Sequence, residues 1–235
     1  MKRTFFTGAI VLAFISLATA ANFWNKKPYT QWSRSDAIQM LTDSPWAKST
    51  LLHSSYGSSR TVAGVQGVED SRTEPMVRYA VTLRSAMPIR QANVRMAAIA
   101  DKYDNMDPAG RQEFDNKWSK YLQMAYANAV VVEVNYGSNL PSLDRELVTY
   151  FQAQKLETIA ESTSLILPDG KKLQPIGFES APHLFVLAFP RPSGLAPNSS
   201  FTVVFQHPGI TDYAAQSITA TYSLKEMGFD GAPAF

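Results

Sequence analysis

Histidines and carboxylates are the residues of this chain that could carry metal-dependent or hydrolytic chemistry. The three histidines, His53, His183 and His207, stand 130 and 24 residues apart, so none has a partner at a zinc-motif spacing. His207 is the most site-like, because it follows a predicted strand and is succeeded by Pro208-Gly209 and Asp212. The alternative is that His207 caps a turn. An enzyme site here would have to be assembled by the fold from distant residues.

Patterns that would indicate a nucleophile, a metal or a phosphate site are missing from the sequence. The chain has no cysteine, no Gly-x-Ser-x-Gly and no Ser-x-x-Lys, and its glycines fall singly or in turns. Glu157 and Glu161 lie one helical turn apart on the same face, where they repel each other. The acidic residues between Asp101 and Asp107 miss the calcium-loop register. We therefore predict no metal and no cofactor.

Aromatic residues crowd the segment that follows the first 20 residues. Exposed rings at Trp24, Tyr29 and Trp32 could stack on a sugar or on a partner protein. The favoured alternative is that they pack the segment against the body, because a hydrophobic residue before a helix cap commonly folds back on the helix. These three aromatics, with His207 and Asp212, are the candidate ligand-binding or partner-binding residues.

The first 20 residues have the organisation of an export signal. Lys2 and Arg3 precede an apolar stretch from Phe5 to Ala18, and Ala18-Thr19-Ala20 predicts cleavage after Ala20. The alternative is a retained membrane anchor, but the stretch is shorter than the roughly 20 residues that span a bilayer. No second stretch approaches that length, so we expect no membrane span after cleavage. The predicted location is periplasmic or secreted.

Charge and cysteine content exclude several protein classes. The chain has 22 lysines and arginines against 20 acidic residues, and two of the basic residues lie in the predicted signal. The remaining balance is neutral, without the basic surface of a nucleic-acid-binding protein. A cysteine-free chain has no disulfides and no cysteine to carry a lipid. The mature protein must be held together by its hydrophobic core, for which its length suffices.

The periodicity of the sequence predicts an α+β fold. Residues 21–48 are expected to form an N-terminal arm with a short helix capped by Ser33, and residues 49–235 a single domain. Helices are predicted as a hairpin near 88–125 and a helix near 142–160, capped by Ser142. Strands are predicted at 50–56, 76–84, 128–136, 164–167, 172–178, 183–189, 200–206 and 217–224, with a long loop at 57–74. Many short strands suggest a mainly antiparallel β-sandwich with inserted helices.

Several segments resemble a group of uncharacterised bacterial secreted proteins that open, after a signal peptide, with a tryptophan, a short helix and a Ser-Pro-Trp-Ala turn. The resemblance rests on Trp32-Ser33-Arg34-Ser35-Asp36-Ala37 and on residues Leu41 to Lys48. Residues Arg84 to Arg90 and Lys225 to Gly231 are similar to later segments of the same group. The resemblance implies a secreted bacterial protein with one fold and implies no activity.

Two functions remain open on this evidence. The first is a non-enzymatic structural or partner-binding module, whose partner would be a cell-envelope or extracellular protein. It predicts an exposed apolar patch or an unpaired sheet edge. The alternative is a hydrolase or metal-dependent enzyme with a site around His207 and Asp212. It predicts a cleft where one of these residues meets another acid or histidine with a perturbed pKa.

Overall fold

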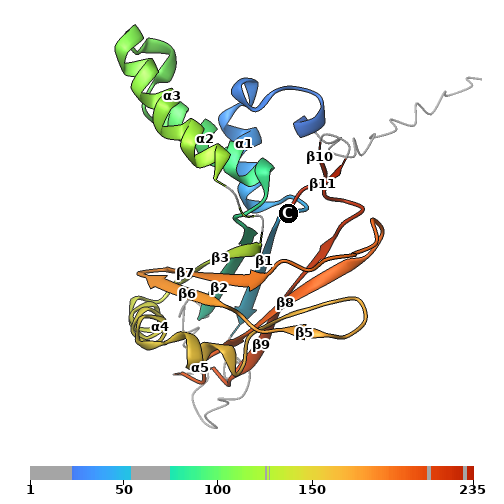
Figure 1. The fold of residues 1–235 in the computed structure, drawn as a ribbon. Helices are drawn as coiled ribbons and strands as arrows, with labels where there is room; N and C mark the ends of the chain where they lie inside the picture. Colours follow the sequence, from blue (N-terminus) through green and yellow to red (C-terminus); the bar gives the residue numbers. More distant parts are fainter. Residues whose placement is uncertain (1–22, 54–74, 125, 127, 211–212, 230–231) are drawn as a thin grey trace, which may run out of the picture.

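The computed structural model describes residues 23–53, 75–124, 126, 128–210, 213–229 and 232–235. Within these residues the fold is α+β, with two main antiparallel sheets and five α-helices, as Figure 1 shows. None of the helices in this part of the chain is long and apolar enough to cross a membrane. The predicted signal peptide, the loop at 57–74 and Asp212 lie outside the described residues.

The first sheet has five strands in the order β1-β2-β3-β7-β6, and every neighbouring pair is antiparallel. In β2 (Met76–Leu83) the side chains of Val77, Tyr79, Val81 and Leu83 are buried and Arg78 is exposed, as a half-buried strand at 76–84 predicts. Thr82, on the face expected to be solvated, is buried as well. The other strands are β1 (Ala47–His53), β3 (Ala129–Ser138), β6 (Gly177–Ala181) and β7 (Leu184–Pro190).

The second sheet has four strands in the order β5-β4-β8-β9. They are β4 (Ser164–Ile166), β5 (Lys172–Leu173), β8 (Ser200–His207) and β9 (Gln216–Ser223). Gly170 has a φ of 83° in the turn between β4 and β5, as the Asp-Gly pair predicts. The single strand predicted at 172–178 is wrong, because the chain leaves β5 and enters β6 in the other sheet. Pro175 lies at this switch, and proline has no N–H for a strand ladder.

The two main sheets share one hydrophobic core. The ring of Phe205 on β8 lies 5.3 Å from that of Tyr79 and 5.5 Å from that of Phe185, and both pairs meet edge to face. The hydroxyl of Tyr222 on β9 donates a hydrogen bond of 2.9 Å to the carbonyl of Val81 on β2. Side chains from β2, β7, β8 and β9 therefore interlock between the sheets.

The predicted helical hairpin is confirmed as α2 (Met87–Ala100) and α3 (Pro108–Gln123), which project away from the sheets in Figure 1. Asp107 caps α3 by accepting a 2.7 Å hydrogen bond from the N–H of Gly110. The guanidinium of Arg90 donates to the carbonyls of Leu122 and Met124, at 2.6 and 2.9 Å. This buried arginine satisfies carbonyls at the end of α3 that have no partner within the helix.

The single helix predicted at 142–160 is two helices, α4 (Pro141–Ala153) and α5 (Leu156–Ala160). Leu140, and not Ser142, occupies the N-cap position of α4. The buried stripe of α4 is Leu143, Leu147 and Phe151, and the ring of Phe151 lies 4.7 Å from those of Tyr136 and Phe185. Gln154 and Lys155 have extended backbone, with ψ of 150° and 164°, so the helix ends after Ala153 and a new one begins at Leu156.

The N-terminal arm is packed into the same core as the sheets. It contains the short 3-10 turns η1 (Phe23–Asn25) and η2 (Tyr29–Gln31), followed by α1 (Arg34–Thr42). Ser33 caps α1 as predicted: its side chain accepts a hydrogen bond from the N–H of Asp36, and the Asp36 carboxylate accepts one from the N–H of Ser33. The ring of Trp24 meets that of Trp46 at 5.4 Å. The indole N–H of Trp46 donates to the carbonyl of Ala234, beside the short pair β10 (Gly228–Phe229) and β11 (Ala232–Pro233).

Candidate binding surface on the five-stranded sheet

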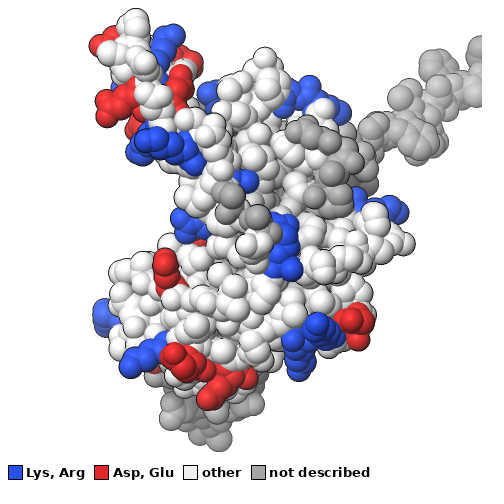
Figure 2. All heavy atoms as spheres, viewed as in Figure 1, with Lys and Arg blue, Asp and Glu red and all other residues white. Residues whose placement is uncertain are grey.

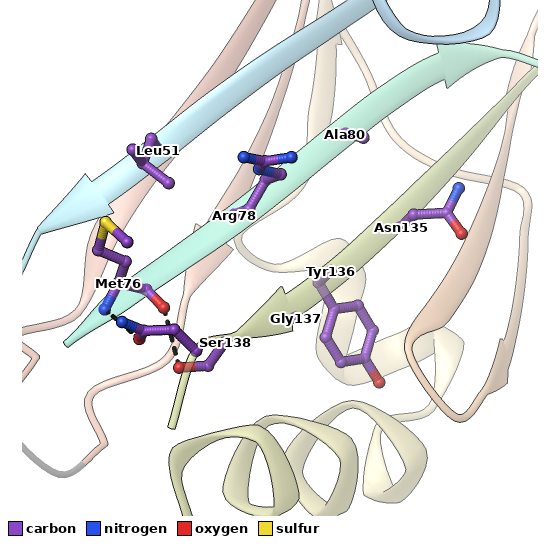
Figure 3. Close-up of a pocket in the computed structure, with 9 residues that line it drawn as sticks. Leu51, Met76, Arg78, Ala80, Asn135, Tyr136, Gly137 and Ser138 are labelled. Atoms are coloured by element: carbon purple, nitrogen blue, oxygen red, sulfur yellow. Dashed lines mark hydrogen bonds between the residues drawn. The ribbon is translucent and has the colours of Figure 1, made fainter. Parts of the chain in front are cut away.

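The outer face of the five-stranded sheet carries a hollow of about 400 Å³, over β1, β2 and the end of β3 (Figure 3). Its lining comes from side chains that alternate with the buried ones. Arg78 is central among them, and Figure 3 shows its side chain lying along the outer face between Leu51 and Ala80. Tyr136 borders the hollow only through its backbone region, because its ring points toward the helices on the other side.

Strand register explains why the hollow forms at this place. Arg78 lies opposite Leu51 on β1 and opposite Gly137 on β3, and Ala80 lies opposite Asn135. Residues directly opposite each other in an antiparallel pair share one face of the sheet. Glycine and alanine in two of these positions contribute almost no side-chain volume. The long Arg78 side chain therefore lies beside open space and not beside a packed neighbour.

The Arg78 guanidinium is exposed and forms no hydrogen bond or salt bridge with a described residue. Other arginines near the core differ in this respect. Arg84 lies 3.5 Å from a carboxylate oxygen of Glu133, and Arg95 donates a 2.5 Å hydrogen bond to the carbonyl of Trp32. A guanidinium carries five N–H donors in a planar fork, which matches a carboxylate or phosphate. In the described part of the chain, no residue accepts a hydrogen bond from the guanidinium of Arg78.

One end of the hollow is held by hydrogen bonds between β2 and the segment after β3, drawn as dashed lines in Figure 3. The side-chain oxygen of Asn139 accepts from the N–H of Met76 at 2.8 Å, and the Ser138 hydroxyl donates to the Met76 carbonyl at 2.8 Å. The carboxylate of Asp144 accepts from the N–H of Ser138 at 3.0 Å. These bonds fix the shape of the hollow before any ligand arrives.

A second hollow of about 270 Å³ continues the first toward α1 and α2. Ala80 and Asn135 border both hollows, so the two adjoin along β2 and β3, and together they are here called the outer groove. The second part is lined by Arg84 and Glu133 and by residues of α1 and α2 such as Ile89. The outer groove thus carries an unpaired cation at one end and an ion pair at the other.

The polar groups that line the outer groove are guanidinium, amide and hydroxyl groups and one carboxylate, that of Glu133, which is paired with Arg84. The guanidinium and amide groups are able to bind a carboxylate and peptide backbone. No group of three histidine, aspartate or glutamate side chains able to hold a metal ion exists among the described residues. Figure 2 shows charged side chains scattered over the visible face, with mixed signs gathered at the tip of the helical hairpin.

The aromatic candidates of the N-terminal arm lie elsewhere. Trp24 and Trp32 are buried, at 7% and 0% exposure, and the ring of Phe23 packs against both. They therefore serve the core, as the packed alternative expects. Tyr29 is half-buried and borders a separate cavity beside the helical hairpin.

His207 is completely buried at the end of β8, between the two sheets. Its Nδ1 lies 2.6 Å from the hydroxyl of Tyr79, while its Nε2 has no partner among the described residues. Burial lowers the pKa of His207 to about 4, so the ring is neutral at physiological pH. Tyr213 packs against it at 5.2 Å. The site-like histidine of the sequence is thus a core residue.

The other two histidines are exposed and lie in different settings. His183 has its Nδ1 3.5 Å from the Asp144 carboxylate, whereas His53 ends the edge strand β1. Sequence reasoning did not select Arg78 or Asn135. The alternation of β2 and β3 places both on a solvated face, but nothing in the sequence separates them from other exposed polar residues.

In comparisons with known proteins, no protein-family model matches this chain, and no curated protein matches it.

Proposed function

We propose that the mature protein is a periplasmic or secreted module that binds a partner protein through the outer groove. The partner would be a cell-envelope or extracellular protein, and the chain would belong to the bacterial secreted group that its opening segments resemble. The observation that carries the proposal is the exposed Arg78 guanidinium, which has no partner in the described part of the chain and lies in a hollow on the outer face of the sheet. In this scheme the two sheets act as a β-sandwich, a scaffold that commonly presents recognition surfaces.

The lining of the outer groove defines the partner segment. A groove that follows two strands suits an extended chain, and small residues at Ala80 and Gly137 let its backbone approach the sheet. Arg78 would pair with a carboxylate of that segment in a bidentate manner. The Asn135 amide borders both hollows; its nitrogen donates a 3.1 Å hydrogen bond to the Glu133 carboxylate, and its oxygen can accept from a backbone N–H. We therefore propose an extended acidic segment.

The enzymatic alternative receives no support from the described geometry. His207 has no exposed surface, and one of its ring nitrogens is already bonded to Tyr79. A general base must come within hydrogen-bond reach of its substrate. A buried histidine without a cleft does not meet that condition.

Site-specific photo-cross-linking in the native cell envelope tests the proposal. A photo-reactive residue is placed at Leu51 or at Asn135, both at the outer groove, and at Glu157 on α5 as the control. We expect one partner protein to be captured from both groove positions and not from Glu157. Arg78→Glu should lower that capture at least about tenfold, because it replaces attraction with repulsion.

Arg145→Glu is the matched charge control, because Arg145 is an exposed arginine on α4 and does not line the outer groove. Capture that is equal at all three cross-linker positions would contradict the proposed surface. Capture at the groove that Arg78→Glu leaves unchanged would contradict the proposed acidic partner segment.

A further inference from the structure

A separate cavity of about 340 Å³ lies between the helical hairpin and the N-terminal arm. It is bordered by α2, by α3, by η2 and by the short turn η3 (Tyr103–Asn105). None of its lining residues belongs to the outer groove. Its volume falls at the lower end of the range for pockets that hold small molecules. We call it the hairpin cavity.

Aromatic rings form one wall of the hairpin cavity, and small residues form the other. Val94 and Ala98 come from α2, whereas α3 contributes Phe114 and Trp118. The rings stand in a row, since Phe114 lies 5.0 Å from Tyr103 and 5.9 Å from Trp118. The difference in side-chain size holds space open between the two helices. The resulting cavity has a largely apolar body.

Carboxylates stand at this aromatic wall without cationic partners. Asp115 accepts a 2.9 Å hydrogen bond from the hydroxyl of Tyr103. Burial, and then the charge of Asp115, raise the pKa of the Tyr29 phenol, which places that ring near the same carboxylate. Neither Asp115 nor the second lining carboxylate, Asp104, forms a salt bridge with a described residue. The negative charge at the hairpin cavity is therefore not neutralised by direct pairing.

The cations of this region are engaged in other contacts. Arg95 lines the cavity and keeps its positive charge, while its guanidinium Nε donates to the Trp32 carbonyl at 2.5 Å; the two lining carboxylates, Asp104 and Asp115, still outnumber it. Arg111 lies over the Tyr103 ring at 5.7 Å and Lys117 over the Trp118 ring at 5.1 Å, and neither lines the cavity. Two of the aromatic rings in the wall thus already attract positive groups of the chain itself.

We propose that the hairpin cavity binds a small organic cation, an amine carried on an apolar body. The ammonium group would pair with the Asp115 carboxylate, and the apolar body would lie against the rings of Phe114 and Trp118. Carboxylate and aromatic faces both favour positive charge, and the Asp115 carboxylate is exposed at the mouth of the cavity, where an ammonium group can reach it. This binding is independent of the partner proposed for the outer groove.

Calorimetric titration with three matched probes tests this site. The probes are 2-phenylethylammonium, the neutral 2-phenylethanol and the anionic 3-phenylpropionate, which share a similar apolar body. We expect saturable binding of the ammonium probe, with the alcohol at least about tenfold weaker and the carboxylate weaker still. A protein that binds the alcohol as tightly as the ammonium, or that binds none of the probes, would overturn the proposal.

Variants on one helix assign the binding to Asp115. Asp115→Asn removes the charge while an amide oxygen can still accept from Tyr103, and it should weaken ammonium binding about tenfold without affecting the alcohol. Glu113→Gln removes a charge from an exposed position on α3 outside the cavity lining and should have no effect. Circular dichroism spectra confirm that both variants fold. Unchanged ammonium affinity in Asp115→Asn would refute the assigned role.

Discussion

The two faces of the strand pair β2 and β3 differ in burial and in packing. On the inner face Tyr79 and Tyr136 are buried in a cluster of aromatic rings that reaches into the second sheet. On the outer face the adjacent residues Arg78 and Asn135 are exposed beside a hollow. Neighbouring residues of one strand therefore lie in different environments, one in the core and the next in the outer groove.

The contrast extends to the polar groups on each side. His207 on the inner side is chemically versatile, yet it is buried, neutral and bonded to Tyr79. Arg78 on the outer side is chemically simple, yet it is exposed and unpaired among the described residues. Histidine is the more common residue in active sites, but here the arginine, and not the histidine, is accessible to a ligand. The exposure and hydrogen-bond partners of a polar residue therefore indicate its role better than its type does.

The largest expected effect is the loss of inner-face packing. Phe205→Ala should lower the free energy of unfolding by about 3–5 kcal/mol, because it leaves a cavity between Tyr79 and Phe185. Leu51→Ala, at an exposed outer position, should cost less than about 1 kcal/mol. Urea denaturation of both variants measures the difference. Equal losses would show that the outer face is also packed in solution.

The next effect concerns the pH dependence of stability at His207. Its folded pKa of about 4 lies below the usual 6.5, so the unfolded chain takes up the proton first as the pH falls. The free energy of unfolding should therefore be unaffected by His207 above about pH 6.5. Between about pH 6.5 and pH 4 the free energy of unfolding should fall by on the order of 3 kcal/mol, because the folded protein does not take up this proton.

Matched variants isolate the His207 contribution. His207→Asn can keep an acceptor for Tyr79 without titrating, so its unfolding free energy should depend less on pH in this range. His183→Asn removes an exposed histidine at a φ of 63°, which asparagine tolerates, and should keep the wild-type slope. If the two variants have the same slope, His207 does not carry the effect.

A smaller effect is expected at the ion pair of the outer groove. Arg84→Gln should lower the unfolding free energy by less than about 1 kcal/mol, because Arg84 and Glu133 are both partly exposed. The difference from wild type should shrink as salt is added. Thermal unfolding at low and high ionic strength measures it. A large, salt-independent loss would place this pair in the core and would weaken the contrast between the faces.

The variant expected to change stability least, Ala80→Tyr, should strongly reduce binding of the proposed partner protein. Ala80→Tyr fills the outer groove with a residue that favours strands, and its unfolding free energy should stay within about 0.5 kcal/mol of wild type. Partner capture from the Leu51 cross-linker should be lost, because the tyrosine occupies the proposed binding space. Stable protein with normal capture would show that the groove is not the surface used.

Local signals in the sequence located most elements of the fold. The strand predicted at 76–84 corresponds to β2, the cap at Ser33 located the start of α1, and Asp169-Gly170 marked the turn between β4 and β5. The break after α4 was missed because single polar residues inside a helix pattern are ordinary. The sheet switch at Pro175 was missed because proximity in sequence suggested one strand, although the proline was a readable signal.

The outer groove could not be located from the sequence in the same way. Arg78 faces Leu51 and Gly137 only because β1, β2 and β3 pair in one particular register. That register brings together residues separated by long stretches of sequence. The hollow also depends on the absence of side-chain volume at Gly137 and Ala80. The residue pattern of one strand does not show which residues of the neighbouring strands lie opposite it, and so it does not predict a hollow.

The bond from the Trp46 indole to the Ala234 carbonyl constrains the order in which the chain can assemble. Asn25 similarly donates its side-chain amide to the carbonyl of Gly228, at 3.3 Å. The tryptophan cluster of the arm therefore stays incomplete until residues 228–234 are available, and contacts across such sequence separations form slowly. The arm lacks these contacts while the segment between them is being synthesised. Such a delay suits a chain that crosses a membrane before folding, as the proposed export requires.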